Sequence, residues 1–273
     1  MNDLNKLARS LAPFGERRVA PASRRDFACK ASCGSLARVA IVTGSSRGIG
    51  RAIANRLVQD GATVIINYSH SADKADAAVK EIEQGGGKAI AIQADVSQVT
   101  DLERLFDDAI DKLGKVDILV NCAGVVVYKP IVEVTEADFD KIMAVNVKGT
   151  YFACQQAAKK MADAGRIVNI SSTTTALMLP TYSAYVASKG AVEQISRVLC
   201  KELGDRQITV NIVSPGPTDT PLFRKGKTEE QIKHFGDMAA LCRIAQVEDI
   251  ARQSVARVPR VEGTVERCDR LFM

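Results

Sequence analysis

The segment "YSAYVASK" at residues 182–189 places two phenols, Tyr182 and Tyr185, close to the ammonium of Lys189. A free tyrosine has a pKa of about 10, and a nearby cation lowers that pKa because it favours the phenolate. Tyr185 and Lys189 are four residues apart and share a helix face. The rise along the helix to Lys189 is about 6 Å from Tyr185 and about 10 Å from Tyr182. Tyr185 is therefore the better acid/base candidate, and Tyr182 is expected to pack at the helix start or to edge a substrate pocket. Ordinary aromatic packing is the alternative for the segment taken alone.

The stretch "TGSSRGIG" at residues 43–50 joins an apolar run to a helical pattern. Gly44, Gly48 and Gly50 permit a tight turn and let backbone N–H groups approach a phosphate at the amino end of the helix. The spacing is G-x-x-x-G-x-G, which differs from the general G-x-G-x-x-G dinucleotide fingerprint. This turn predicts a nucleotide-phosphate site.

The same turn also contains G-x-S-x-G, from Gly44 to Gly48, which is the nucleophile-elbow pattern of α/β-hydrolases. A hydrolase needs an acid and then a histidine downstream. The chain has only two histidines, His70 and His234, and His234 lies in the charged run "TEEQIKHF". The sequence therefore disfavours a hydrolase.

The segment after the second apolar run concerns the choice of cofactor. NAD-binding proteins usually place an acid there to hold the ribose 2′-hydroxyl, but this chain reads Asn67-Tyr68-Ser69. Arg47 in the glycine turn carries a guanidinium that can pair with a 2′-phosphate. The pattern favours NADP(H) over NAD(H), and the alternative is that Arg47 is a solvated turn residue.

Apolar β-branched runs alternate with helical patterns from residue 37 onward. Strands that are apolar throughout are typical of a parallel sheet buried on both faces. The fold class is therefore α/β, with one doubly wound, Rossmann-type parallel sheet and helices on both faces. Strands are expected within 37–44, 62–68, 88–96, 116–124, 166–172 and 208–216, and helices within 48–61, 71–87, 99–114, 136–161 and 183–203.

Residues 37–273 form a single predicted domain, preceded by a basic extension at residues 1–36. Residues 1–38 hold eight Lys/Arg and three Asp/Glu, whereas residues 39–250 have a net charge of −2. The extension has an amphipathic, Arg- and Ser-bearing start that fits either an organelle transit segment or a disordered cytosolic extension, and its acidic residues favour the latter.

Composition limits the classes of function. The mildly acidic body shows no nucleic-acid footprint, and no apolar run is long enough to span a membrane. The seven cysteines are odd in number and scattered, which favours a reducing, cytoplasmic compartment. No Cys/His cluster has the spacing of a metal site, so no metal is expected.

Several ordered markers resemble the short-chain dehydrogenase/reductase family. The resemblance covers residues 38–251, and its 3-oxoacyl-reductase-like and carbonyl-reductase-like members are the most similar in pattern. The markers are "TGSSRGIG" (43–50), "ADV" (94–96), "NCAG" (121–124), "VNVKG" (145–149), Ser172, Tyr185 with Lys189, and "PGPTDT" (215–220).

The resemblance implies a role for each matching residue. Tyr185 is the implied acid/base, Lys189 assists it and binds the ribose, Ser172 holds the substrate oxygen, and Asn146 anchors a proton-relay water. Ser172 ends a strand, where the carboxyl edge of the sheet forms the usual ligand crevice. The implied cofactor-binding set also contains Gly44, Ser46, Arg47, Gly48, Ile49, Gly50, Asn67, Ser69, Asp95, Val96, Asn121, Ala123, Gly124, Pro215, Gly216, Thr218 and Thr220.

The chain departs from the family pattern after about residue 252. An apolar helix, a short strand and a glycine pair are expected there, but the sequence reads "RQSVARVPRVEGTVERCDRLFM". The helix loses its apolar face, Pro259 would break it, and "VEGTV" is the candidate last strand. The preceding segment, 221–240, is expected to be a lid over the substrate pocket.

These features predict an NADP(H)-dependent oxidoreductase that reduces a ketone or 3-oxoacyl carbonyl to a secondary alcohol, or catalyses the reverse reaction. The expected partners are a small carbonyl or alcohol substrate and further copies of the chain, as a dimer or tetramer. The alternative is a catalytically weak family member that acts as a nucleotide-binding or interaction protein because of its altered tail.

Overall fold

The computed structural model describes residues 37–256 and 270–272. Its centre is a seven-stranded sheet in the order β3-β2-β1-β4-β5-β6-β7, in which every pair of neighbours is parallel. The strands are β1 (Val39–Val42), β2 (Thr63–Tyr68), β3 (Lys88–Gln93), β4 (Ile118–Asn121), β5 (Arg166–Ile170), β6 (Thr209–Ser214) and β7 (Arg270–Phe272). The strand order reverses between β1 and β4, and such a switch point is where open α/β sheets bind ligands.

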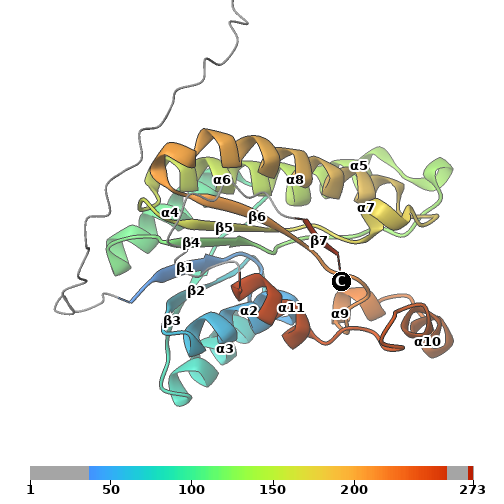
Figure 1. Cartoon of the computed structure of the whole chain (residues 1–273), viewed down its shortest axis with the longest axis horizontal. Helices are drawn as coiled ribbons and strands as arrows, with labels where there is room; N and C mark the ends of the chain where they lie inside the picture. Colours follow the sequence, from blue (N-terminus) through green and yellow to red (C-terminus); the bar gives the residue numbers. More distant parts are fainter. Residues whose placement is uncertain (1–36, 257–269, 273) are drawn as a thin grey trace, which may run out of the picture. The chain divides into compact units, whose positions relative to one another are not determined.

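Helices cover both faces of the sheet (Figure 1). One layer contains α4, α6 and α8, and the other contains α2, α3 and α11. The helices are α2 (Gly48–Gln59), α3 (Ala72–Gln84), α4 (Val99–Leu113), α5 (Glu136–Ile142), α6 (Gly149–Lys160), α7 (Thr174–Leu177), α8 (Ser183–Glu202), α9 (Pro221–Arg224), α10 (Glu229–Asp237) and α11 (Val247–Val255), with short turns of 3-10 helix at Ile131–Glu133 and Gly204–Arg206.

The core lies in two apolar layers, one on each face of the sheet. Ile41 and Phe106 belong to the layer beneath α4, α6 and α8, whereas Ile53 and Ile250 belong to the layer beneath α2, α3 and α11. All residues of β1, β4 and β5 are buried, as the continuous apolar runs predict. The predicted fold class is confirmed.

The helix predicted over residues 136–161 is interrupted. Between α5 and α6, Met143–Lys148 form a π-helix (η2), and this segment contains Asn146. Such π segments are often found at functional sites.

The structure describes part of the tail. The last helix keeps a buried face, because Ile250, Ala251, Ser254 and Val255 are all buried in α11. The expected loss of an apolar face concerned residues 252 onward, and most of that stretch lies outside the described residues, so this expectation stays a prediction. The candidate strand "VEGTV" and Pro259 lie outside the described residues, as do residues 1–36, and the described strand beside β6 is β7.

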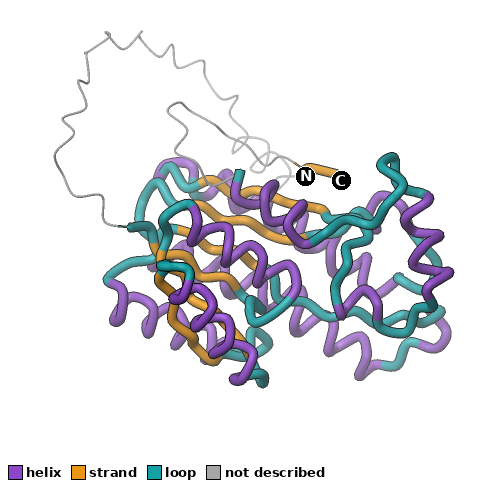
Figure 2. The backbone as a smooth tube through the Cα atoms, turned by 90° about the horizontal axis from the view of Figure 1, so that it is seen from below, coloured by secondary structure: helices purple, strands orange, loops and turns teal. Residues whose placement is uncertain are grey.

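The segment predicted as a lid contains α9 and α10. Figures 1 and 2 place these helices beyond the carboxyl ends of the strands, on the side where α5 and α7 also lie. Within the described part of the chain, no helix combines the length and apolar character needed to cross a bilayer, and no group of three or more His, Cys, Asp or Glu is placed to hold a metal.

Candidate active site

Tyr185 and Lys189 lie on one face of the first two turns of α8. The Lys189 Nζ atom is 5.7 Å from the centroid of the Tyr185 ring and donates a hydrogen bond of 2.7 Å to the carbonyl of Ile170, at the carboxyl end of β5. The Lys189 side chain is buried, and this burial lowers the pKa of its ammonium to about 8. One bond to a carbonyl leaves further N–H donors of the ammonium for a ligand.

Ser172 follows β5 and faces Tyr185. The hydroxyl of Ser172 is buried and accepts a hydrogen bond of 2.9 Å from the hydroxyl of Thr174. Burial raises the pKa of Tyr185 to about 12, and the hydrogen bond with Ser172 acts in the opposite direction. Burial dominates, so the expected lowering of the Tyr185 pKa is wrong.

Asn146 fastens the segment after β4 to α8. Its Oδ1 atom accepts from the Val125 N–H at 2.9 Å, and its Nδ2 group donates to the Val125 carbonyl at 2.9 Å and to Ser188 Oγ at 3.0 Å. Ser188 Oγ in turn donates to the Tyr185 carbonyl at 2.6 Å. Every polar atom of the Asn146 side chain is thus engaged, and its expected role at a proton-relay water stays a prediction.

Tyr182 sits at the start of α8 between two other phenols. Its ring centroid lies 5.0 Å from that of Tyr128 and 6.2 Å from that of Tyr185, in edge-on geometry. A hydrogen bond with Tyr128 lowers the Tyr182 pKa, but burial outweighs it and the net shift is upward. Tyr182 packs at the helix start and lines a cavity of about 550 Å³ that Lys227 also lines. That this cavity is the substrate pocket stays a prediction.

The glycine turn is packed closely against the ends of two other strands. Gly44 and Gly48 have φ angles of +64° and +57°, which residues other than glycine rarely adopt. A Cβ atom on Gly44 would lie 2.8 Å from Ala123 Cα, and one on Gly50 would lie 2.7 Å from the Gly44 carbonyl oxygen. A Cβ on Gly48 would lie 3.7 Å from Thr220 Cγ2, so the turn and "PGPTDT" meet.

The amino end of α2 fits an anionic group. No side chain caps it, and its first turn contains no acid, so its N–H groups have no competing carboxylate. Arg47 precedes the helix and is exposed, while Ser46 and Ile49 are half-buried in the turn. Together with the spare donors of the Lys189 ammonium, this chemistry suits the phosphates and ribose of a dinucleotide.

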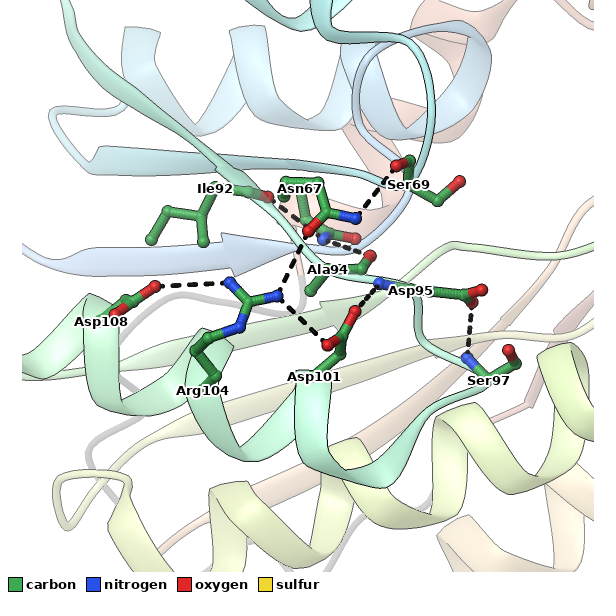
Figure 3. Close-up of polar contacts among 10 residues, drawn as sticks. Asn67, Ser69, Ile92, Ala94, Asp95, Ser97, Asp101, Arg104 and Asp108 are labelled. Carbon is green, nitrogen blue, oxygen red and sulfur yellow. Dashed lines mark hydrogen bonds and ion pairs between the residues drawn. The ribbon is translucent and has the colours of Figure 1, made fainter.

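Asn67 is buried and contacts both the glycine turn and β3 with its following loop, and Figure 3 shows its bonds to Ile92 and Ala94. Its Oδ1 atom accepts from the Gly44 N–H at 3.1 Å, and its Nδ2 group donates to the carbonyls of Ile92 at 3.4 Å and Ala94 at 3.1 Å. All its polar atoms are therefore used to hold the turn against β3. The structure gives Asn67 a positioning role, and direct contact with the cofactor stays a prediction.

The neighbouring loops after β2 and β3 are also braced (Figure 3). The Asp95 N–H donates to Asp101 at 2.8 Å, which is the largest cause of the lowered pKa of Asp101. Ser69 Oγ lies 2.9 Å from His70 Nδ1, and its carbonyl accepts from Gln93 at 3.1 Å. Val96 is buried next to Asp95, against Gly149.

The remaining predicted cofactor residues lie on β4 and β6 or directly after them. Asn121 points into the core and donates to Asn169 at 2.8 Å, whereas Gly124 lies beside Asn146 and Lys189. The Pro215 carbonyl accepts from Thr173, which joins this segment to the Ser172 loop. Gly216 accepts from the Thr218 hydroxyl at 2.9 Å, and Thr220 caps α9.

Tyr128 and Lys227 line the cavity next to Tyr182, and the sequence interpretation missed both. No motif contains Tyr128, and Lys227 lies in a charged segment that looks like a solvated surface. The capping box of Thr228 and Gln231, visible as "TEEQ", would have predicted the start of α10 and hence a structured lid.

Several known proteins that are similar to this chain are named as reductases. It is 40% identical over 227 residues to elsinochrome reductase 1 of Elsinoe fawcettii, covering 79% of this chain and 85% of that protein. It is 37% identical over 227 residues to a probable tetrahydroxynaphthalene reductase of Zymoseptoria tritici, with the same coverages. The solved structure of the angucycline C-6 ketoreductase LanV with bound NADP matches with a TM-score of 0.77 and 37% identity, covering 82% of this chain and 90% of that one.

The family comparison agrees with these relatives and with the ordered motifs. The family profile described as short chain dehydrogenase matches residues 38–231. The glycine turn, Ser172, Tyr185 and Lys189 all fall within the matched region. The chain therefore belongs to the short-chain dehydrogenase/reductase family.

Proposed function

We propose that this protein is an NADP(H)-dependent reductase that converts a ketone to a secondary alcohol, or catalyses the reverse oxidation. The observation that carries the proposal is the convergence of Ser172, Tyr185 and Lys189 at the carboxyl end of β5, where the Lys189 Nζ atom lies 5.7 Å from the Tyr185 ring centroid and donates to the Ile170 carbonyl. A bound nicotinamide would supply the hydride to the carbonyl carbon. Tyr185 would give its phenolic proton to the carbonyl oxygen, Ser172 would orient that oxygen, and Lys189 would hold the ribose.

The protonation states support the reductive direction at neutral pH. A Tyr185 pKa of about 12 keeps the phenol protonated, so the proton donor is ready. A Lys189 pKa of about 8 keeps its ammonium charged at pH 7. The complete set of catalytic groups also argues against the alternative of a catalytically weak binding protein.

The proposed cofactor preference rests on Arg47 and on the absence of an acid at Asn67. The NADP complex of LanV supports it. We expect Arg47→Ala to weaken NADPH binding by about tenfold and NADH binding much less, since one charge-assisted bond to the 2′-phosphate is lost. Arg56→Ala, which removes a half-buried cation in α2, the helix that Arg47 precedes, is the control. Dissociation constants from fluorescence titration would contradict the proposal if native protein preferred NADH.

A ring ketone is the favoured substrate, and a 3-oxoacyl compound is the second candidate. The cavity of about 550 Å³ is lined by Tyr128, Tyr182 and Phe235, whose rings suit a flat substrate. Tyr185 is not among its lining residues, but the Tyr185 ring contacts that of Tyr182. The names of the naphthalene and angucycline reductases among the relatives point the same way. The test is NADPH oxidation with 2-tetralone and with a 3-oxoacyl thioester. If the protein reduces neither compound, the proposal is overturned.

The proposed assembly is a homo-oligomer working in a reducing, cytoplasmic compartment. Phe139, Tyr151 and Val198 are large apolar side chains on α5, α6 and α8 that are each at least 45% exposed. A second copy of the chain would cover them. Light scattering that finds only monomer would contradict this part of the proposal.

A further inference from the structure

The ammonium of Lys227 is held in an aromatic setting between α9 and α10. Its Nζ atom lies 3.8 Å from the centroid of the Tyr128 ring and 4.8 Å from that of Phe223, and it donates to the Phe223 carbonyl at 2.9 Å. Burial lowers its pKa. Among the described residues, no carboxylate forms an ion pair with it. This is a partly desolvated cation with N–H donors to spare.

The position of Lys227 links it to the proposed chemistry. It lines the cavity of about 550 Å³ together with Tyr128 and Tyr182. The Tyr128 ring touches that of Tyr182, and the Tyr182 ring touches that of Tyr185. A substrate whose carbonyl reaches Tyr185 would therefore extend past two tyrosine rings towards the Lys227 ammonium.

We infer that Lys227 is a specificity-determining residue that binds an anionic oxygen of the substrate, a carboxylate or an ionised phenol, remote from the carbonyl that is reduced. This inference rests on the proposed function and names its substrate class as acidic ring ketones. An anionic oxygen would give the ammonium the charged partner that the protein does not provide, in a pocket where burial strengthens the attraction.

One other charge in the cavity opposes this binding. Glu230 is the sole carboxylate among the residues that line it. It makes no ion pair with Lys227, so the two charges act separately on a ligand. Removing the Glu230 charge should therefore strengthen the binding of an acidic substrate.

A purely structural role for Lys227 predicts something different. The cation–π contact between Lys227 and Tyr128 ties the lid to the segment after β4. If this contact were the whole role of Lys227, replacing Lys227 would weaken the binding of acidic and neutral ligands equally. A matched pair of ligands separates the two roles.

The experiment is calorimetric titration of the full-length protein with NADP⁺ present, so that no ketone is turned over. The probes are 6-oxo-5,6,7,8-tetrahydronaphthalene-2-carboxylate and its methyl ester, which share a ring system and differ in charge. We expect native protein to bind the acid about tenfold more tightly than the ester, the factor that 1.4 kcal/mol represents. Lys227→Met should abolish this preference, and Lys225→Met, at an exposed lysine two residues away, should keep it.

Three results decide the inference. It is overturned if native protein shows no preference for the acid, or if Lys227→Met weakens acid and ester by the same factor. The Glu230→Gln variant should show a larger preference for the acid over the ester than native protein does. An unchanged preference would overturn the inference, even if Lys227→Met fails to fold. The proposed function fails separately: Tyr185→Phe should lose turnover with NADPH but keep the preference in binding.

Discussion

The two sides of the site differ in how their polar groups are held. On the catalytic side, Lys189 and Asn146 are buried and bonded to backbone groups of other elements. On the lid side, Arg224 is exposed and pairs with Asp219 and Glu229, each five residues from it. The catalytic geometry is thus fixed by the folding of the whole sheet, whereas the lid is organised locally. We therefore expect substitutions among the exposed lid residues to cost little stability.

The largest expected difference lies within the catalytic side, between its two tyrosines. Tyr185→Phe should lower carbonyl reduction by about 10²–10⁴-fold, because it removes the positioned proton donor but keeps the ring. Tyr182→Phe should change turnover by less than about tenfold, since it loses only the hydrogen bond with Tyr128. Steady-state kinetics with 2-tetralone checks both. A dead Tyr182→Phe beside an active Tyr185→Phe would show that the acid/base is assigned to the wrong tyrosine.

The next largest expected effect is a difference in stability between variants of a buried amide, Asn67, and of an exposed carboxylate, Glu229. Asn67→Asp would replace two donated bonds by a carboxylate oxygen facing the carbonyls of Ile92 and Ala94, at a cost of about 2–4 kcal/mol in free energy of unfolding. Glu229→Gln in the lid should change it by less than about 0.5 kcal/mol. Urea denaturation measures both. Equal stabilities would contradict the contrast between the two sides. Asn67→Asp should also weaken the binding of NADH and NADPH together, because the loss of these bonds loosens the glycine turn itself.

A smaller effect should appear with pH at Lys189. Its folded-state pKa of about 8 lies below the ordinary value of 10.5, so the folded state prefers the neutral amine and gains stability as pH rises from about 8 towards 10.5. Relative to Lys189→Met, native protein should gain about 2 kcal/mol in free energy of unfolding between pH 7 and pH 9.5. Denaturation curves of both proteins at the two pH values test this. If the difference in free energy of unfolding between native protein and Lys189→Met stays constant with pH, burial does not perturb the pKa of Lys189.

The smallest effect is expected at the amino terminus. Removal of residues 1–34 should leave the melting temperature and turnover unchanged, because β1 begins at Val39. Thermal melts and kinetics of the shortened protein provide the test. Unfolding of the shortened protein would show that the basic extension contributes to the domain.

The fold was predictable because its signals are local and repeated. Apolar runs such as residues 39–42 and 118–121 could only be strands buried on both faces. Ser172, Tyr185 and Lys189 were predictable because strand ends and helix spacing fix their positions. The structural role of Asn67 was not, because its partners Ile92 and Ala94 lie more than twenty residues away and are brought together only by the pairing of β2 with β3.

The pocket was less predictable for a different reason. Tyr128 and Lys227 are about a hundred residues apart, and neither belongs to a motif. Their contact depends on where α9 and α10 settle, which no local pattern determines. The rise of the Tyr185 pKa was equally hidden, because a sequence shows neighbouring charges but not the extent of burial.

The π-helical segment Met143–Lys148 makes the chain intolerant of length changes at one point. Each residue of an α-helix turns the chain by about 100°. A single deletion here, which restored the α-helical spacing, would rotate the whole of α6 and swing Ala153 and Ala157 out of the core. It would also separate Asn146 from Val125. Among homologous sequences, insertions and deletions should therefore gather in the lid and avoid residues 143–148.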